Sequence, residues 1–125
     1  MAMKILICDD EPYIRMLLEQ TLEDLEDEGV EILIASNGQE GYDLIVEEKP
    51  QLVFLDVMMP KLSGFEVCEK VKKQPELQHI HIVLLTAKGQ EADKEKGLSL
   101  GANEYITKPF DPDNLYDYAC EQLGL

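Results

Sequence analysis

Four of the apolar runs in this 125-residue sequence end in polar side chains whose types could do chemistry together. These side chains are the pair Asp9-Asp10, Asp56, Thr86 and Lys108. If they met, the three carboxylates and one ammonium would carry a net charge of −2. Each like-charged pair at about 4 Å would cost on the order of 4 kcal/mol at an effective dielectric constant near 20. A divalent cation would remove that repulsion, so these residue types indicate a metal site.

The kind of ion and the reaction follow from the same residues. Carboxylate ligands favour a hard ion. Mg²⁺ keeps bound waters and shares its ligands with phosphate, so it suits a site with few protein ligands better than Ca²⁺ does. Magnesium beside a carboxylate, a lysine and a hydroxyl is typical of sites that carry out phosphoryl transfer. Asp56 is the best candidate for the nucleophile, because Thr86 and Lys108 could meet the oxygens of a phosphoryl group placed on it. Asp9 and Asp10 would then hold the metal.

Each of these residues also has a plain structural interpretation. Asp9-Asp10 could be a solvated acidic loop that caps the following helix. Asp56 could cap a turn before Pro60, and Lys108 could be an ordinary surface lysine. The functional interpretation therefore depends on whether the fold brings the strand ends together.

The elements that would position these residues alternate along the chain. Five short apolar runs have the length of strands, and segments with helical periodicity separate them. The expected strands are residues 4–8, 31–35, 52–56, 81–86 and 104–107. Such alternation requires a parallel sheet covered by helices on both faces, which is the α/β class. In these sheets the ligand crevice lies at the carboxyl ends of the strands, where the polar residues stand.

The expected helices carry start and stop signals. The first is expected over residues 12–28, with Gly29 as its stop. The second and third begin at Asn37 and Ser63, and in each case a glutamate follows three residues later, at the spacing of a capping box.

The last two helices differ in strength. The fourth, at about residues 90–100, contains Gly97 and lies between Gly89 and Gly101, which lowers its intrinsic stability. The fifth begins at Asp111-Pro112. We expect it to turn an apolar stripe inward and two other residues outward. The stripe is Leu115, Tyr118, Ala119 and Leu123, and the outward residues are Tyr116 and Asp117.

Length and charge bound the functional class. At 125 residues the chain can hold one core, so we expect a single domain over residues 1–125. A formal charge of −15 makes direct nucleic-acid binding unfavourable. No apolar stretch approaches the roughly 20 residues of a membrane span, and the first residues do not form a signal peptide. We therefore expect a cytoplasmic protein with no membrane partner.

Cysteine and histidine usage points to no second site. Cys8, Cys68 and Cys120 are odd in number and widely separated, which predicts reduced thiols rather than a disulfide framework or a zinc site. His79 and His81 could be metal ligands or phosphoryl carriers, but we interpret them as polar residues that lead into a strand.

Taken in order, the motifs resemble a known family. They are similar to the receiver domain of bacterial two-component response regulators, and the resemblance covers essentially the whole chain. The matching segments are Asp9-Asp10, Leu55-Asp56-Val57-Met58-Met59-Pro60 with Ser63-Gly64, Thr86-Ala87, and Tyr105-Ile106-Thr107-Lys108-Pro109-Phe110. Each motif alone is common, but five in this order are specific. The resemblance implies a flavodoxin-like, CheY-like fold, a doubly wound (βα)5 sheet with strand order 2-1-3-4-5.

The resemblance implies the parts of a Mg²⁺-dependent phosphoacceptor site. Asp56 would accept a phosphoryl group from the phosphohistidine of a histidine kinase or phosphotransfer protein. Asp10, Asp56 and the main-chain carbonyl of Met58 would bind Mg²⁺, and Asp9 would act through a bound water. Such a domain would assist its own phosphorylation and dephosphorylation without being an enzyme for a separate substrate.

The resemblance also implies a switch. Thr86 and Lys108 would bind the phosphoryl oxygens, and the Lys108–Pro109 peptide bond would be cis. Tyr105 would rotate inward as Thr86 moves, although it could also be only a half-buried strand aromatic. The fourth helix, fifth strand and fifth helix would then bind a protein partner. The domain would be a monomer or a phosphorylation-dependent dimer.

Three further hypotheses stay open from the sequence. The chain could be the receiver part of a larger regulator with a missing output domain, although we expect output through protein contacts alone. It could be a Mg²⁺-dependent phosphatase-type hydrolase, but Met58 stands where such enzymes place a second aspartate as acid and base. It could also be a pseudo-receiver that acts as a constitutive binding module, which the presence of all five site residues disfavours.

Overall fold

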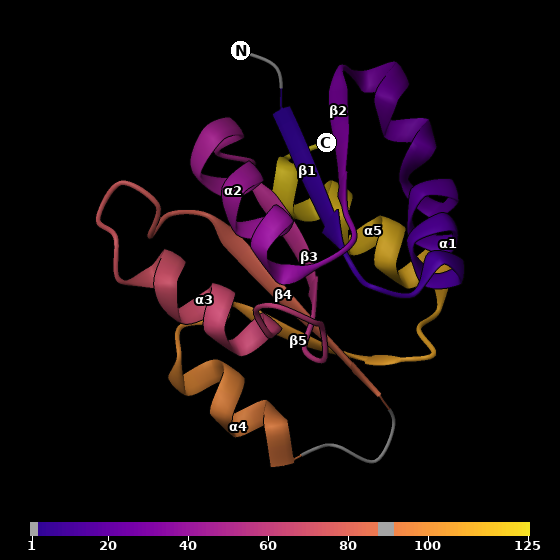
Figure 1. Ribbon diagram of the computed structural model, residues 1–125. Helices are drawn as coiled ribbons and strands as arrows, with labels where there is room; N and C mark the ends of the chain where they lie inside the picture. The colour runs from indigo at the N-terminus through magenta and orange to yellow at the C-terminus, as the bar shows by residue number, and fades with distance from the viewer. Residues whose placement is uncertain (1–2, 88–91) are drawn as a thin grey trace.

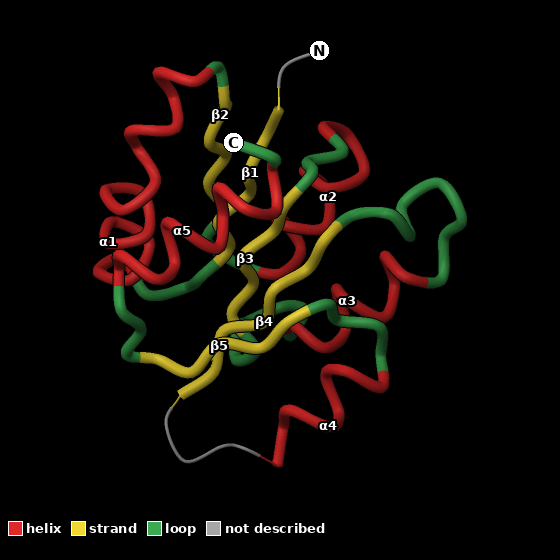
Figure 2. The backbone as a smooth tube through the Cα atoms, turned by 180° about the vertical axis from the view of Figure 1, so that it is seen from behind, coloured by secondary structure: helices red, strands yellow, loops and turns green. Residues whose placement is uncertain are grey.

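The computed structural model describes residues 3–87 and 92–125, which form one five-stranded sheet between two layers of helices (Figures 1 and 2). All four neighbouring strand pairs are parallel, and the order is β2-β1-β3-β4-β5. The strands are β1 Met3–Cys8, β2 Val30–Ala35, β3 Leu52–Asp56, β4 His81–Ala87 and β5 Glu104–Lys108. The expected fold class and strand order are confirmed.

Helices cover both faces of the sheet. They are α1 Pro12–Leu22, α2 Gly38–Glu48, α3 Gly64–Lys72, α4 Ala92–Ser99 and α5 Pro112–Leu123. One face packs against α2 and α3 with α4 beside them, and the other packs against α1 and α5. The first residues of the expected fourth helix, together with Gly89, lie outside the described residues. Among the described residues, no helix has both the length and the apolar character that crossing a membrane requires.

The core consists of two clusters, one on each face of the sheet. Leu6 and Val53 belong to the cluster beneath α2 and α3, whereas Ile5 and Phe54 belong to the cluster beneath α1 and α5. Successive strand residues point to opposite faces, so a strand covered on both sides must be apolar at consecutive positions. This is why the buried parts of the three inner strands, β1, β3 and β4, appear in the sequence as apolar runs.

The expected first helix over residues 12–28 is wrong in its last six residues. The α-helix ends at Leu22, and a 3₁₀ helix, η1 Glu23–Glu28, continues to Gly29. Acidic side chains crowd this segment, and negative charge at a helix C-terminus repels both its neighbours and the helix dipole. The tighter turns still bury Leu25 in the core. Gly29 ends the segment in the left-handed region with φ of 86°, as the stop signal predicted.

The start signals of the second and third helices are confirmed. At Ser63 the capping box is complete, because the Glu66 amide donates to Ser63 Oγ at 3.2 Å and the Ser63 amide donates to Glu66 Oε1 at 3.0 Å. At Asn37 only half of the box forms. The Glu40 amide donates to Asn37 Oδ1 at 2.9 Å, but the Glu40 carboxylate accepts from the amide of Ser36 instead.

The fifth helix departs from expectation at one position. Its start is confirmed, because the Asp111 side chain accepts from the amides of residues 113 and 114. Leu115 and Ala119 are buried as expected and Asp117 is exposed, but Tyr116 is half-buried rather than turned outward. Tyr116 packs at the edge of the core because α5 lies against α1, which covers positions beside the inner stripe.

Glycine at position 64 allows α3 to begin directly against the end of β3. The Gly64 amide donates to the carbonyl of Val57 at 2.8 Å. A Cβ atom at this position would lie 2.3 Å from the main-chain oxygen of Asp56 and 2.9 Å from the Cα atom of Val57. Backbone atoms on a short connection cannot move away as a flexible side chain could, so the loop after Asp56 depends on this glycine.

We predict that Gly64→Ala lowers the free energy of unfolding by about 2 kcal/mol or more, because the added methyl group overlaps backbone atoms. Urea denaturation measures the loss. Gly124→Ala is the control, since its Cβ would meet nothing within 4 Å among the described residues. Its φ of 74° makes that change cost only about 1 kcal/mol. Equal losses for the two variants would contradict the prediction.

Candidate functional site

The carboxyl ends of the strands bring the expected site residues to one edge of the sheet. Asp9 follows β1 and is fully buried, and Asp56 ends β3 with 4% of its surface exposed. Thr86 is buried on β4, one residue beyond the Leu85 that pairs with Asp56. Lys108 is the last residue of β5. The interpretation of Asp9 as part of a solvated loop is therefore wrong.

The ammonium group of Lys108 joins three carboxylates. Its Nζ atom lies 3.3 Å from Asp9 Oδ2, 3.3 Å from Asp56 Oδ1 and 3.3 Å from Glu11 Oε1. The Lys108 side chain is only 11% exposed, so it is no ordinary surface lysine. These contacts connect β5 to the ends of β1 and β3 and to the start of α1.

Hydrogen bonds fix the position of Asp9. Its Oδ1 atom accepts from the amide of Glu11 at 2.9 Å, and its main-chain oxygen accepts from Arg15 Nη1 at 2.8 Å. Its own amide donates to the carbonyl of Ala35 on β2 at 3.3 Å. Sequence reasoning missed Arg15, although it is the single arginine in the chain and stands on the first turn of the helix that follows Asp9.

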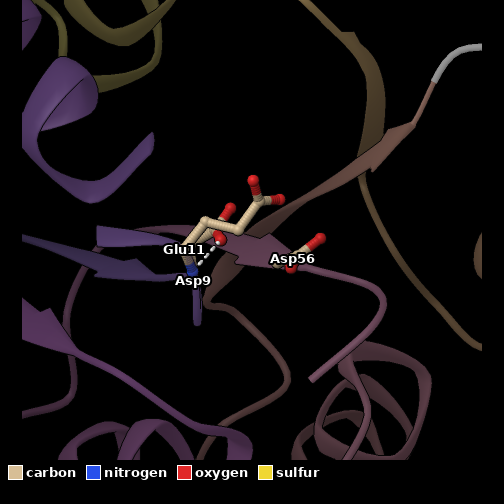
Figure 3. A group of neighbouring side chains, drawn as sticks. All are labelled: Asp9, Glu11 and Asp56. Carbon is tan, nitrogen blue, oxygen red and sulfur yellow. Dashed lines mark hydrogen bonds between the residues drawn. The ribbon is translucent and has the colours of Figure 1, made fainter. Parts of the chain in front are cut away.

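The structure adds Glu11 to the acidic cluster. Asp9, Glu11 and Asp56 each offer a carboxylate oxygen, and these oxygens lie within 4.8 Å of one another (Figure 3). Glu11 was not expected at the site from the sequence. Asp10, expected as a direct ligand, is exposed.

Charge and burial shift the pKa values of this group. Burial raises the pKa of Asp56 to about 7, repulsion by Asp9 adds to the rise, and Lys108 opposes it. Burial likewise raises the pKa of Asp9 against the opposing effects of the Glu11 amide and Lys108. Burial alone would lower the pKa of Lys108, but attraction to Asp56 and Asp9 outweighs it, so that pKa is raised. The site holds more negative charge than one ammonium balances.

This donor set fits a hard cation. Asp9, Glu11 and Asp56 supply carboxylate oxygens only, and such ligands are typical of Mg²⁺ and Ca²⁺ rather than of zinc. Met58, whose carbonyl was expected to contribute, follows Asp56 by two residues and is 66% exposed. A cation could therefore supply the positive charge that Lys108 alone does not.

The other expected residues lie on β4 and β5. Thr86 is buried next to the strand end, and Tyr105 is half-buried on the face of the sheet that packs against α2 and α3. Tyr105 pairs with Leu84 in the register of β4 and β5, two residues before Thr86. The Lys108–Pro109 peptide bond is cis, as the resemblance implied.

The comparisons with known proteins agree with this geometry. The family model of the response regulator receiver domain matches residues 5–119. A crystal structure of a CheY-like response regulator receiver domain protein from Methanospirillum hungatei is 31% identical, with a TM-score of 0.86 over 99% of this chain and 95% of that one. The chemotaxis protein CheY4 of Vibrio cholerae is 29% identical, with a TM-score of 0.83 over 97% of this chain and 98% of that one.

Curated relatives are longer than this chain. The chain is 45% identical over 112 residues to the protein named "Probable transcriptional regulator ycf27" of Porphyra purpurea, and 44% identical to the protein of that name from Guillardia theta. Each match covers 90% of this chain but only 44% and 42% of those proteins. The fold, the strand-end carboxylates and the family match lead to one conclusion: the chain belongs to the response regulator receiver domains of two-component signalling.

Proposed function

We propose that this receiver domain accepts a phosphoryl group on Asp56 in a Mg²⁺-dependent reaction. The observation that carries the proposal is the buried Asp56 carboxylate at a strand end, 3.3 Å from Lys108 and beside a second buried carboxylate, Asp9. Carboxylates held together against their repulsion are the arrangement that a cation and a phosphoryl group can use.

In the proposed reaction, an ionised oxygen of Asp56 attacks the phosphorus atom of a phosphohistidine on a histidine kinase or phosphotransfer protein. The new O–P bond forms as the P–N bond breaks, and the bonding electron pair leaves with the imidazole nitrogen. Mg²⁺, held by Asp10, Asp56 and the Met58 carbonyl with Asp9 acting through water, would neutralise the charge on the transferred group. Lys108 needs only to turn its ammonium from the carboxylates to a phosphoryl oxygen.

The proposed output is a change on the surface of α4, β5 and α5. Thr86 would move toward the phosphoryl group and Tyr105 would follow, and the position of Tyr105 beside Leu84 supports such a connection. A cavity of about 430 Å³ lies along β5 and the start of α5, where Tyr105, Phe110 and Tyr118 contribute to its lining. We propose that this surface binds a protein partner in the cytoplasm.

A second possibility concerns the length of the whole protein. The chain spans less than half of the curated relatives that it matches, and those relatives are named as transcriptional regulators. We propose that, if the domain controls transcription, the DNA is bound by another segment. The charge of −15 on these 125 residues would repel the DNA backbone.

We predict that acetyl phosphate and Mg²⁺ together add one phosphoryl group to the protein, and that Asp56→Asn abolishes the adduct because it removes the nucleophilic oxygen. Intact-protein mass spectrometry detects the adduct, and an assay for free phosphate follows turnover. Omitting Mg²⁺ should slow the reaction by at least about tenfold, since the repulsion within the site then remains. Asp117→Asn is the matched control, because Asp117 lies at an exposed position of α5. This variant should react like the wild type.

Two outcomes would overturn this proposal. Rapid release of phosphate over many turnovers would show a hydrolase rather than a phosphoacceptor. A protein that stays unmodified with saturating donor and Mg²⁺ would show a pseudo-receiver.

We also predict that, without Mg²⁺, Asp56→Asn is more stable than the wild type at neutral and higher pH. The native pKa of Asp56 is raised to about 7, so its ionisation opposes folding. The penalty is absent below the unfolded-state pKa of about 3.9, grows as pH rises and is complete above about pH 7, where it reaches on the order of 4 kcal/mol. Urea denaturation at several pH values measures the difference between the two proteins.

The effect of the metal provides the control for this prediction. Mg²⁺ should stabilise the wild type at about pH 8 far more than Asp56→Asn, since a ligand that binds only the native state raises its stability. A difference between the variants that is independent of pH and of Mg²⁺ would contradict the prediction.

A further inference from the structure

Glu11 occupies the N-cap position of α1 without acting as a cap. Ser, Thr, Asp and Asn are preferred at this position because their short side chains reach the free amides of the first turn. Among the described residues, the Glu11 side chain makes no capping hydrogen bond. Its carboxylate instead extends toward Asp56 (Figure 3). Its Oε1 atom lies 3.3 Å from Lys108 Nζ.

The three carboxylates around Lys108 differ in their freedom to move. The side chains of Asp9 and Asp56 are 0% and 5% exposed, and Asp9 is fixed by the hydrogen bond that its Oδ1 accepts from the Glu11 amide. The Glu11 side chain is 60% exposed. Exposed ion pairs are weak and exchange readily with water, so Glu11 is the partner that Lys108 can release at little cost.

The ammonium group has three N–H donors, and three carboxylates lie within reach of them. An arriving phosphoryl group is an anion that needs the same ammonium. We propose that Glu11 is an exchangeable counter-ion of Lys108, which competes with the incoming phosphoryl group and so sets the rate at which Asp56 accepts it. This inference rests on the proposed function of Asp56.

A different role for Glu11 is a direct ligand to the metal, because its carboxylate oxygen also lies within 4.8 Å of those of Asp9 and Asp56. The two roles have opposite consequences. Loss of a ligand would weaken Mg²⁺ binding, whereas loss of a counter-ion would leave Mg²⁺ binding nearly unchanged and free Lys108 for an anion. The contact with Lys108 and the exposure of the side chain favour the counter-ion.

The test compares Glu11→Gln with Glu19→Gln, which removes the same charge from an exposed position on α1. We expect Glu11→Gln to form the adduct from acetyl phosphate about threefold faster than Glu19→Gln at saturating Mg²⁺, as the loss of a half-exposed ion pair predicts. Its affinity for beryllofluoride, an analogue of the phosphoryl group, should rise by a similar factor. Calorimetry should give both variants the same Mg²⁺ affinity within about twofold.

Glu11→Asp separates the contact from the charge. The shorter side chain keeps its charge but is expected to cap the amides of α1 rather than reach Lys108. It should therefore react faster than the wild type, as Glu11→Gln does. If Glu11→Asp behaves like the wild type, the effect comes from net charge and the proposed contact is not its cause.

The remaining outcomes are also decisive. A clear loss of Mg²⁺ affinity in Glu11→Gln would make Glu11 a metal ligand and overturn the inference. Equal rates for Glu11→Gln and Glu19→Gln would overturn it as well, while the wild-type adduct would leave the proposed function of Asp56 intact. Failure of the wild type to form an adduct would instead reject the proposed function itself.

Discussion

The structure depends on one ammonium group shared among carboxylates from distant parts of the chain. Lys108 meets Asp9 and Asp56 in a buried position, across sequence separations of 99 and 52 residues. Such contacts exist only if β5, β3 and β1 end at the same edge, which the parallel order of the sheet ensures. The apolar strands therefore hold the carboxylates and the ammonium close together and away from water, an arrangement that these groups would not adopt in solution.

The fold keeps the carboxylates of Asp9 and Asp56 closer than they would lie in solution. Burial raises the pKa of both Asp9 and Asp56, and a single lysine only partly offsets that effect. The free energy that the fold supplies to keep these groups together becomes available when a cation balances their charge. The same local imbalance would account for both parts of the proposed function, the binding of a cation and the reactivity of Asp56.

The features that could be predicted from the sequence are those that follow from the geometry of strand ends and helix caps. Asp56, Thr86 and Lys108 were found because each stands at or beside the end of an apolar run, and Ser63 was found because its cap needs a glutamate three residues later. Glu11 and Arg15 were missed because their roles depend on side-chain directions within a loop that no periodicity describes. The boundary at Leu22 was missed because repulsion among acidic residues overrode a regular apolar spacing.

Gly97 brings the backbone of α4 close to β4. A Cβ atom there would lie 2.5 Å from Leu84 Cδ1, so at this point the helix rests its backbone directly on the side chain of β4. Close by, Lys96 Nζ lies 4.7 Å from the centre of the Phe65 ring, a cation–π contact between α4 and α3. Leu84 is also the register partner of Tyr105. The backbone of α4 therefore packs on Leu84 without an interlocking side chain at this point. The same leucine is aligned with Tyr105, so it connects the position of α4 to that of the tyrosine.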